Sequence, residues 1–131
     1  MTVREHFVLT MKLQGFVPQE AKLKEIADKV GLSAHFDSLI STLSPGSKRK
    51  LSIGLALIGD PSLLILDEPT ANLDLNSREK VWKILIQLVS RPGSRMSVLV
   101  STQHIEEAET LSSRIFIIKD GTKILCDTVG N

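Results

Sequence analysis

The hydrophobic pattern of the chain changes near residue 60, from apolar residues at helical spacing to short continuous apolar runs. Three helices are predicted before that point. The first follows a capping box, in which Thr2 is the N-cap and Glu5 lies three residues on, and it extends to about Leu13. The second begins at the Pro-Gln-Glu sequence of residues 18–20, where proline is tolerated, and ends at Gly31.

The third helix is predicted to begin near Pro45 and to continue through Leu51, Leu55 and Ile58. Glycine, aspartate and proline in the three positions after Ile58 form a stop signal. Residues 32–46 are otherwise expected to form loop and short helix.

Beyond residue 60, strands are predicted to alternate with helices. Short apolar runs predict three strands, at residues 63–66, 97–101 and 115–118. Helical spacing of apolar residues predicts two helices, at residues 77–90 and 105–111. The first two strands are expected to be buried on both faces of a parallel sheet, and Asp120 with Gly121 predicts a two-residue hairpin turn after the third. This order predicts an α/β fold, with helical residues 1–59 packed beside sheet-forming residues 60–131.

The composition is that of a folded globular chain, and it argues against several classes of function. Hydrophobic residues make up 42% and charged residues 24% of the 131 positions, which suffice for one domain. The formal net charge of +1 gives no indication of a nucleic-acid partner. Cys126 is the only cysteine, so a disulfide framework is excluded and a reducing cytoplasm is favoured. No apolar run reaches the roughly 18 residues of a transmembrane helix, so membrane attachment is expected through a partner chain or another segment.

Two carboxylates follow the first predicted strand directly. Asp67 and Glu68 come immediately after the apolar residues 63–66, and ligands of open α/β sheets bind outside the carboxyl ends of the strands. One acid there can hold Mg²⁺, which prefers oxygen ligands, and a second acid can orient or deprotonate an attacking water. Four apolar residues and two acids would, by themselves, more often be a buried strand that ends in a solvated loop.

The continuation of this segment favours the catalytic interpretation. Residues 66–74 are Leu-Asp-Glu-Pro-Thr-Ala-Asn-Leu-Asp, which resembles the Walker B motif and D-loop of ATP-binding-cassette (ABC) ATPases. The resemblance implies a partial P-loop-type nucleotide-binding domain that uses ATP and Mg²⁺. It also implies that Asp67 helps to hold the metal, that Glu68 acts as the base or orients water, and that Asp74 serves the dimer interface around the nucleotide.

Residues 43–47, Leu-Ser-Pro-Gly-Ser, resemble the ABC signature Leu-Ser-Gly-Gly-Gln. A helix N-terminus with unpaired N–H groups favours a phosphate, and the resemblance implies that Ser44 and Gly46 contact the γ-phosphate of ATP held by the opposite domain of a dimer. Pro45 and Ser47 depart from the motif, and Pro45 removes one N–H donor, so this contact is expected to be weakened. Alone, the pentapeptide would more often be an ordinary helix cap.

Residues 101–109, Ser-Thr-Gln-His-Ile-Glu-Glu-Ala-Glu, resemble the switch-histidine region of the family. The alignment puts Gln103, rather than His104, at the switch position, where it is predicted to sense the γ-phosphate. A glutamine can donate a hydrogen bond to a phosphate but cannot carry positive charge or move a proton. This stretch and the basic residues after the signature resemble the A subfamily of eukaryotic transporters and bacterial drug-export ATPases.

The phosphate-binding loop of the family, Gly-x-x-x-x-Gly-Lys-Ser/Thr, has no counterpart, because no glycine in the chain is followed by lysine. We therefore expect a truncated or excised part of a cassette, with part of the helical subdomain at residues 1–59 and the Walker B, D-loop and switch segments at residues 60–131. For the complete protein, the family implies ATP hydrolysis coupled to transport, with a second ABC ATPase domain and a transmembrane domain as partners, at the cytoplasmic face of a membrane. Two alternatives stay open: a degenerate half-site that pairs with an active partner, and an ABC ATPase of translation or DNA repair.

Overall fold

The computed structural model describes residues 1–128, apart from the side chains of residues 125–127, so the Cys126 thiol lies outside the described part. Three helices come first, α1 (Val3–Leu13), α2 (Glu20–Lys29) and α3 (Pro45–Ala56), with short 3-10 turns at Ser33–His35 and Ile40–Thr42 between the last two. Strands and helices then alternate as β1 (Leu63–Asp67), α4 (Leu75–Ser90), β2 (Ser97–Ser101), α5 (Ile105–Leu111), β3 (Arg114–Lys119) and β4 (Thr122–Thr128). This order confirms the predicted α/β architecture.

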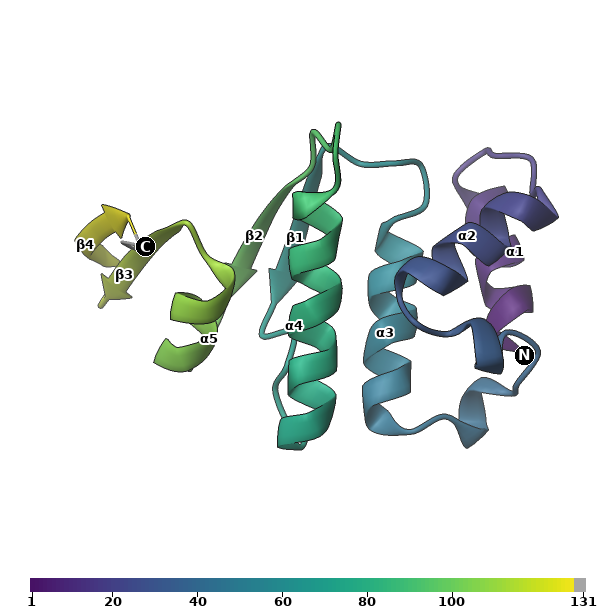
Figure 1. Ribbon diagram of the computed structural model, residues 1–131, viewed down its shortest axis with the longest axis horizontal. Coiled ribbons are helices and arrows are strands. Elements are labelled where there is room, and N and C mark those ends of the chain that lie inside the picture. Colours follow the sequence, from purple (N-terminus) through teal and green to yellow (C-terminus); the bar gives the residue numbers. More distant parts are fainter. Residues whose placement is uncertain (129–131) are drawn as a thin grey trace.

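The helices and strands are arranged along the long axis of the molecule. Figure 1 shows α1, α2 and α3 grouped at one end, α4 beside α3, and the β3–β4 hairpin at the other end. One hydrophobic core extends from α1 to α4, and its buried members include Phe7, Ile26, Ile53, Leu64 and Val81. Within residues 1–128, no helix is long and apolar enough to cross a membrane.

Close local contacts hold the helices of the first half together. The predicted capping box is present, since Glu5 N–H donates to Thr2 Oγ1 at 3.1 Å and Thr2 N–H donates to Glu5 Oε2 at 2.8 Å. A Cβ added at Gly54 of α3 would lie 3.0 Å from two ring carbons of Phe7 on α1. The two helices therefore pack so closely that position 54 has no room for a side chain.

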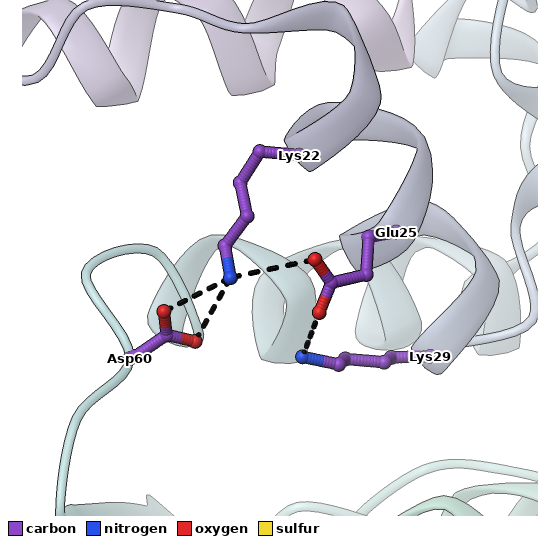
Figure 2. Close-up of polar contacts among 4 residues, drawn as sticks. All are labelled: Lys22, Glu25, Lys29 and Asp60. Atoms are coloured by element: carbon purple, nitrogen blue, oxygen red, sulfur yellow. Dashed lines mark hydrogen bonds and ion pairs between the residues drawn. The ribbon is translucent and has the colours of Figure 1, made fainter.

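A chain of ion pairs ties α2 to the turn after α3, as Figure 2 shows. Lys22 Nζ lies 2.9 Å from Asp60 Oδ2 and 3.5 Å from Glu25 Oε2, and Glu25 Oε1 lies 2.6 Å from Lys29 Nζ. The hydrogen bond to Asp60 raises the pKa of Lys22 above its ordinary value. Because the chain continues from Asp60 through residues 61–62 into β1, this ion pair joins the helical part to the sheet-forming part.

The strands β1 and β2 form a parallel pair in which Asp67 lies opposite Ser101. The prediction that both faces are buried is wrong: Leu64 is 3% exposed, whereas Ile65 and its neighbour Leu99 are 66% and 55% exposed. Successive side chains of a strand point to opposite faces. The face that carries Leu64 packs against the hydrophobic core, to which α4 also contributes. Within residues 1–128, the face that carries Ile65 and Leu99 is exposed to solvent.

The third predicted strand does not join this parallel pair. The strand β3 pairs antiparallel with β4 in a separate two-stranded sheet. The turn between them is the predicted one, and Asp120 and Gly121 have φ values of 50° and 74°. Positive φ at both central residues is what a type I′ hairpin turn requires, so the C-terminal hairpin is confirmed.

Candidate functional site

The carboxyl end of β1 holds the predicted metal-binding acid Asp67 and the predicted catalytic acid Glu68, beside the end of β2. Asp67 is the last residue of β1, and its Oδ1 atom accepts a hydrogen bond from the Ser101 hydroxyl. Glu68 N–H donates both to the hydroxyl oxygen and to the carbonyl oxygen of Ser101, each at 3.1 Å. Asp67 is exposed and Glu68 is half-buried. Ser101 therefore fixes the Asp67 side chain and the Glu68 backbone at the carboxyl end of the parallel pair.

Glu68 adopts a backbone conformation that is uncommon for a residue with a Cβ. Its φ is 45°, in the left-handed region that costs an L-residue roughly 1–2 kcal/mol. The two hydrogen bonds to Ser101 hold Glu68 in this turn, and Ala71 N–H donates to the Glu68 carbonyl at 3.1 Å. Strained residues that their surroundings enforce gather at functional sites, so the observed φ supports a functional hypothesis for Glu68.

The signature segment forms the N-terminus of α3. Ser44 is the N-cap, its hydroxyl oxygen accepts from Ser47 N–H at 3.1 Å, and Pro45 occupies the first turn. Gly46 is buried, and a Cβ added there would lie 2.8 Å from Ser77 Oγ at the start of α4. Gly46 thus permits direct contact between the first turns of α3 and α4, a packing role that the sequence did not indicate.

Asp74 caps α4 in the same way that Ser44 caps α3. Its Oδ1 accepts from Ser77 N–H at 2.9 Å, and its Oδ2 accepts from the Ser77 hydroxyl at 2.6 Å. These hydrogen bonds lower the pKa of the exposed Asp74 carboxyl. The arrowheads of β1 and β2 point toward the lower side in Figure 1, where α3 and α4 also begin. The end of β1, with Asp67, and the starts of α3 and α4, with Ser44, Gly46 and Asp74, therefore lie on the same side of the molecule.

The switch segment lies between β2 and α5. Gln103 and His104 are both exposed, and His104 is the N-cap of α5 without a side-chain cap bond. The backbone N–H of His104 donates to Thr102 Oγ1 at 3.0 Å. His104 thus immediately precedes the helix predicted at residues 105–111, and Gln103 lies before it in the loop.

A buried carboxylate behind these loops was missed from the sequence. Glu107 on α5 is 0% exposed, and it accepts hydrogen bonds from Thr70, Trp82 and Thr102. In the sequence, Trp82 falls at an apolar position of the helix predicted at residues 77–90. A buried tryptophan usually has a partner for its indole N–H, and that rule was the one available signal.

The donor set at the strand ends fits a hard cation. Asp67 Oδ2 has no hydrogen-bond donor among the described residues, and the side-chain group that hydrogen-bonds to both Asp67 and Glu68 is the Ser101 hydroxyl, an oxygen. Mg²⁺ prefers oxygen ligands and keeps several waters, so one protein carboxylate can suffice beside phosphate oxygens. Among the side chains of residues 1–124 and 128, no group of three or more His, Cys, Asp or Glu residues is arranged to hold a metal. The residues thus fit a shared magnesium site rather than an all-protein one.

Comparisons with known proteins show what this chain is similar to. The family model described as ABC transporter matches residues 1–71. The chain is 37% identical to the ABC transporter ced-7 of Caenorhabditis elegans over 95% of this chain, and 38% identical to human ATP-binding cassette sub-family A member 9 over 96%. It is 38% identical over 99% of this chain to the daunorubicin/doxorubicin resistance ATP-binding protein DrrA of Streptomyces peucetius.

The chain spans only part of each relative. It covers 7% of ced-7, 8% of sub-family A member 9 and 39% of DrrA. Among solved structures, the ADP conformation of an ATP-binding cassette of an ABC transporter matches with a TM-score of 0.82 and 18% identity, over 98% of this chain and 55% of that one. An inward-facing ABC transporter of the metal-chelate type matches with a TM-score of 0.84 and 18% identity, over 98% and 53%. These structures support the fold.

Proposed function

This chain belongs to the ABC transporter family, and from that premise we propose that it supplies the signature helix, Walker B strand, D-loop and switch segment of a cassette that binds and hydrolyses ATP. Its relation to the ATPase domains of the A subfamily and of DrrA follows from the family match and the relatives. In the complete protein, hydrolysis is coupled to transport across a membrane. Its partners are a second cassette domain and a transmembrane domain, with this chain at the cytoplasmic face.

The arrangement of Asp67 and Glu68 is the observation that supports hydrolysis most strongly. Asp67 would hold Mg²⁺, whose charge stabilises phosphate oxygens when it is bound. Glu68 stands next to it in an enforced left-handed turn, where its carboxylate can orient a water or accept its proton. Ser101 keeps both acids in place through hydrogen bonds to Asp67 Oδ1 and from Glu68 N–H.

The remaining site residues serve a dimer in this proposal. Ser44 and Gly46 begin α3, whose N-terminal dipole favours the γ-phosphate of ATP held by a partner domain. Asp74 is the N-cap of α4. Because Gly46 packs on Ser77 of that helix, Asp74 lies beside the start of α3, and we assign it to the dimer interface. Gln103 lies exposed after β2 and donates a hydrogen bond toward the γ-phosphate.

The chain does not provide a phosphate loop of its own. Backbone N–H groups and the lysine of that loop supply most contacts to the phosphates in P-loop proteins, and no Gly-Lys pair occurs here. A test therefore needs a completed cassette, which we define as this chain joined to the phosphate-loop part of another family member.

Trapping of a nucleotide-bound dimer tests the proposal. Glu68→Gln keeps the shape of the side chain but removes its ability to accept a proton, so the completed cassette should bind Mg-ATP and accumulate as a dimer, measured by sedimentation. Glu106→Gln is the matched control, because Glu106 is exposed on α5, and it should not accumulate. A Glu68→Gln cassette that binds no ATP, or that binds it and stays monomeric, would argue against the proposed site.

One observation favours a second candidate, a degenerate half-site that pairs with an active partner. At the start of α3, Pro45 has no N–H and the Ser47 N–H is already bonded to Ser44 Oγ. Fewer donors are thus open to a phosphate. Because this helix end faces the ATP held by the partner domain, that ATP would be hydrolysed slowly, and turnover of the mixed dimer would depend on the ATP held beside Glu68. Replacing the partner's equivalent glutamate would then leave the hydrolysis rate nearly unchanged, whereas Glu68→Gln would abolish it.

A further inference from the structure

Glu107 is a fully buried carboxylate that has no basic side chain as a salt-bridge partner among the described residues. It is 0% exposed, and among residues 1–128 no lysine, arginine or histidine forms a salt bridge with it. A buried charge is costly unless hydrogen bonds satisfy it. Glu107 lies in the first turn of α5, where the helix dipole favours negative charge, but that contribution alone does not replace the lost hydration.

Three hydrogen bonds from three separate segments satisfy this carboxylate. Glu107 Oε1 accepts from Thr70 Oγ1 at 2.7 Å and from Trp82 Nε1 at 2.9 Å. Glu107 Oε2 accepts from Thr102 Oγ1 at 2.5 Å. Thr70 belongs to the loop after β1, Trp82 to α4 and Thr102 to the loop after β2. One side chain on α5 thus joins three segments that are far apart in the sequence.

The chemistry of the donors explains why an acid occupies this position. An ionised carboxylate only accepts hydrogen bonds, and it has room for several. The indole of Trp82 can only donate. A glutamine at position 107 would turn an amide N–H toward one of these partners, and an alanine would leave two buried donors and the half-buried Thr102 hydroxyl unpaired, which is unfavourable.

The joined segments are those that carry the proposed catalytic residues. Thr70 is itself 0% exposed and lies two residues after Glu68 and four before Asp74, and Thr102 immediately precedes Gln103. We propose that Glu107 is a positioning residue that fixes the loop carrying Glu68 and Asp74 relative to the loop carrying Gln103. The importance of Glu107 for catalysis rests on the proposed function, whereas the coupling between the two loops is a property of the chain itself.

Hydrogen exchange measured by mass spectrometry tests this coupling on the chain without nucleotide, at low micromolar concentration. Thr70→Val removes one hydroxyl and keeps the shape of the side chain. It should accelerate backbone exchange about tenfold in residues 101–106 as well as in residues 68–74, since a hydrogen bond to a charged group contributes about that factor to a local opening equilibrium. Thr102→Val should likewise accelerate exchange in residues 68–74 as well as in residues 101–106. Thr70→Ser, which keeps the hydroxyl, should restore slow exchange in both segments.

The only tryptophan of the chain gives an independent readout. Trp82 is that residue, so in the folded chain the fluorescence comes from a side chain that is hydrogen-bonded to Glu107. Thr70→Val, Thr102→Val and Glu107→Gln should each change its emission, while Glu106→Gln should not. Glu106→Gln removes the same charge from the same first turn at an exposed position, and it thereby controls for the helix dipole.

The outcomes separate this inference from the proposed function. Faster exchange confined to the loop that carries the substitution, with no effect on the other loop, would overturn the coupling. In a completed cassette, Thr102→Val should lower kcat about tenfold with KM for ATP nearly unchanged, because the substitution misplaces Gln103 without removing a ligand contact. If the unmodified completed cassette does not hydrolyse ATP, the proposed function fails, and the exchange experiment still decides the coupling.

Discussion

Replacing Gly46 by alanine tests whether the signature helix and the D-loop helix depend on direct contact. The added Cβ would lie 2.8 Å from Ser77 Oγ and 3.0 Å from Ser77 Cβ, closer than such atoms pack. The Ser77 side chain cannot simply rotate away, because its hydroxyl is bonded to Asp74 Oδ2 at 2.6 Å. The start of α3 or of α4 must therefore move.

The sign of the change in unfolding free energy shows whether the starts of α3 and α4 are in direct contact. An alanine in place of a helical glycine contributes at most about 1 kcal/mol of favourable helix propensity, and overpacking costs about 1–3 kcal/mol. We expect a net destabilisation on the order of 1 kcal/mol. In urea unfolding followed by Trp82 fluorescence, that corresponds to a midpoint lower by about 0.5 M for a slope near 2 kcal/mol/M.

A second substitution provides the control for Gly46→Ala. Ser77→Gly removes both atoms that the new Cβ would meet, so Gly46→Ala should cost nothing or become stabilising in that background. A Gly46→Ala chain that is more stable than the original by about 1 kcal/mol, the value of helix propensity alone, would refute the contact.

Three further predictions concern the nucleotide, the switch residue and pH. The chain alone should bind Mg-ATP very weakly or not at all in calorimetry, because it has no Gly-Lys loop; low-micromolar binding by a monomer would contradict this. In a completed cassette, Gln103→His should raise turnover about tenfold with little change in ATP affinity, because charge-assisted hydrogen bonds are stronger than neutral ones, whereas His104→Ala should have little effect. The opposite pattern would shift the switch alignment by one residue. Since the hydrogen bond to Asp60 raises the pKa of Lys22, the stabilisation from this pair should be fully present below the ordinary lysine pKa and should be lost as the pH rises through the raised value; identical pH dependence of unfolding for the original chain and Lys22→Gln would refute it.

Local signals in the sequence predicted the elements well. The Thr2–Glu5 capping box, the Pro45 helix start and the Asp120–Gly121 turn depend on neighbouring residues only, and the structure has all three. The burial of β1 and β2 depends instead on what covers each face. An apolar run such as residues 63–66 cannot reveal that Ile65 stays exposed while Leu64 is buried.

The site was predictable where a motif carried it and not where distant contacts built it. Asp67 and Glu68 lie at the strand end that the motif implied, and their roles stay a prediction. The Glu107 hydrogen bonds join residues 25 and 37 positions apart, and the Gly46 contact reaches Ser77 on another helix. No local pattern encodes such pairs, because they arise only when the helices pack.

The rate of ATP hydrolysis by the completed cassette tests the central claim most directly, with the original chain compared against Glu68→Gln. If this chain supplies the hydrolytic carboxylate of an ABC cassette, the original should turn over Mg-ATP and Glu68→Gln should be slower by about 100-fold or more, the range that a positioned base contributes, with ATP binding retained. Equal turnover by the two proteins would contradict the claim, since Glu68 would then neither orient nor deprotonate the attacking water.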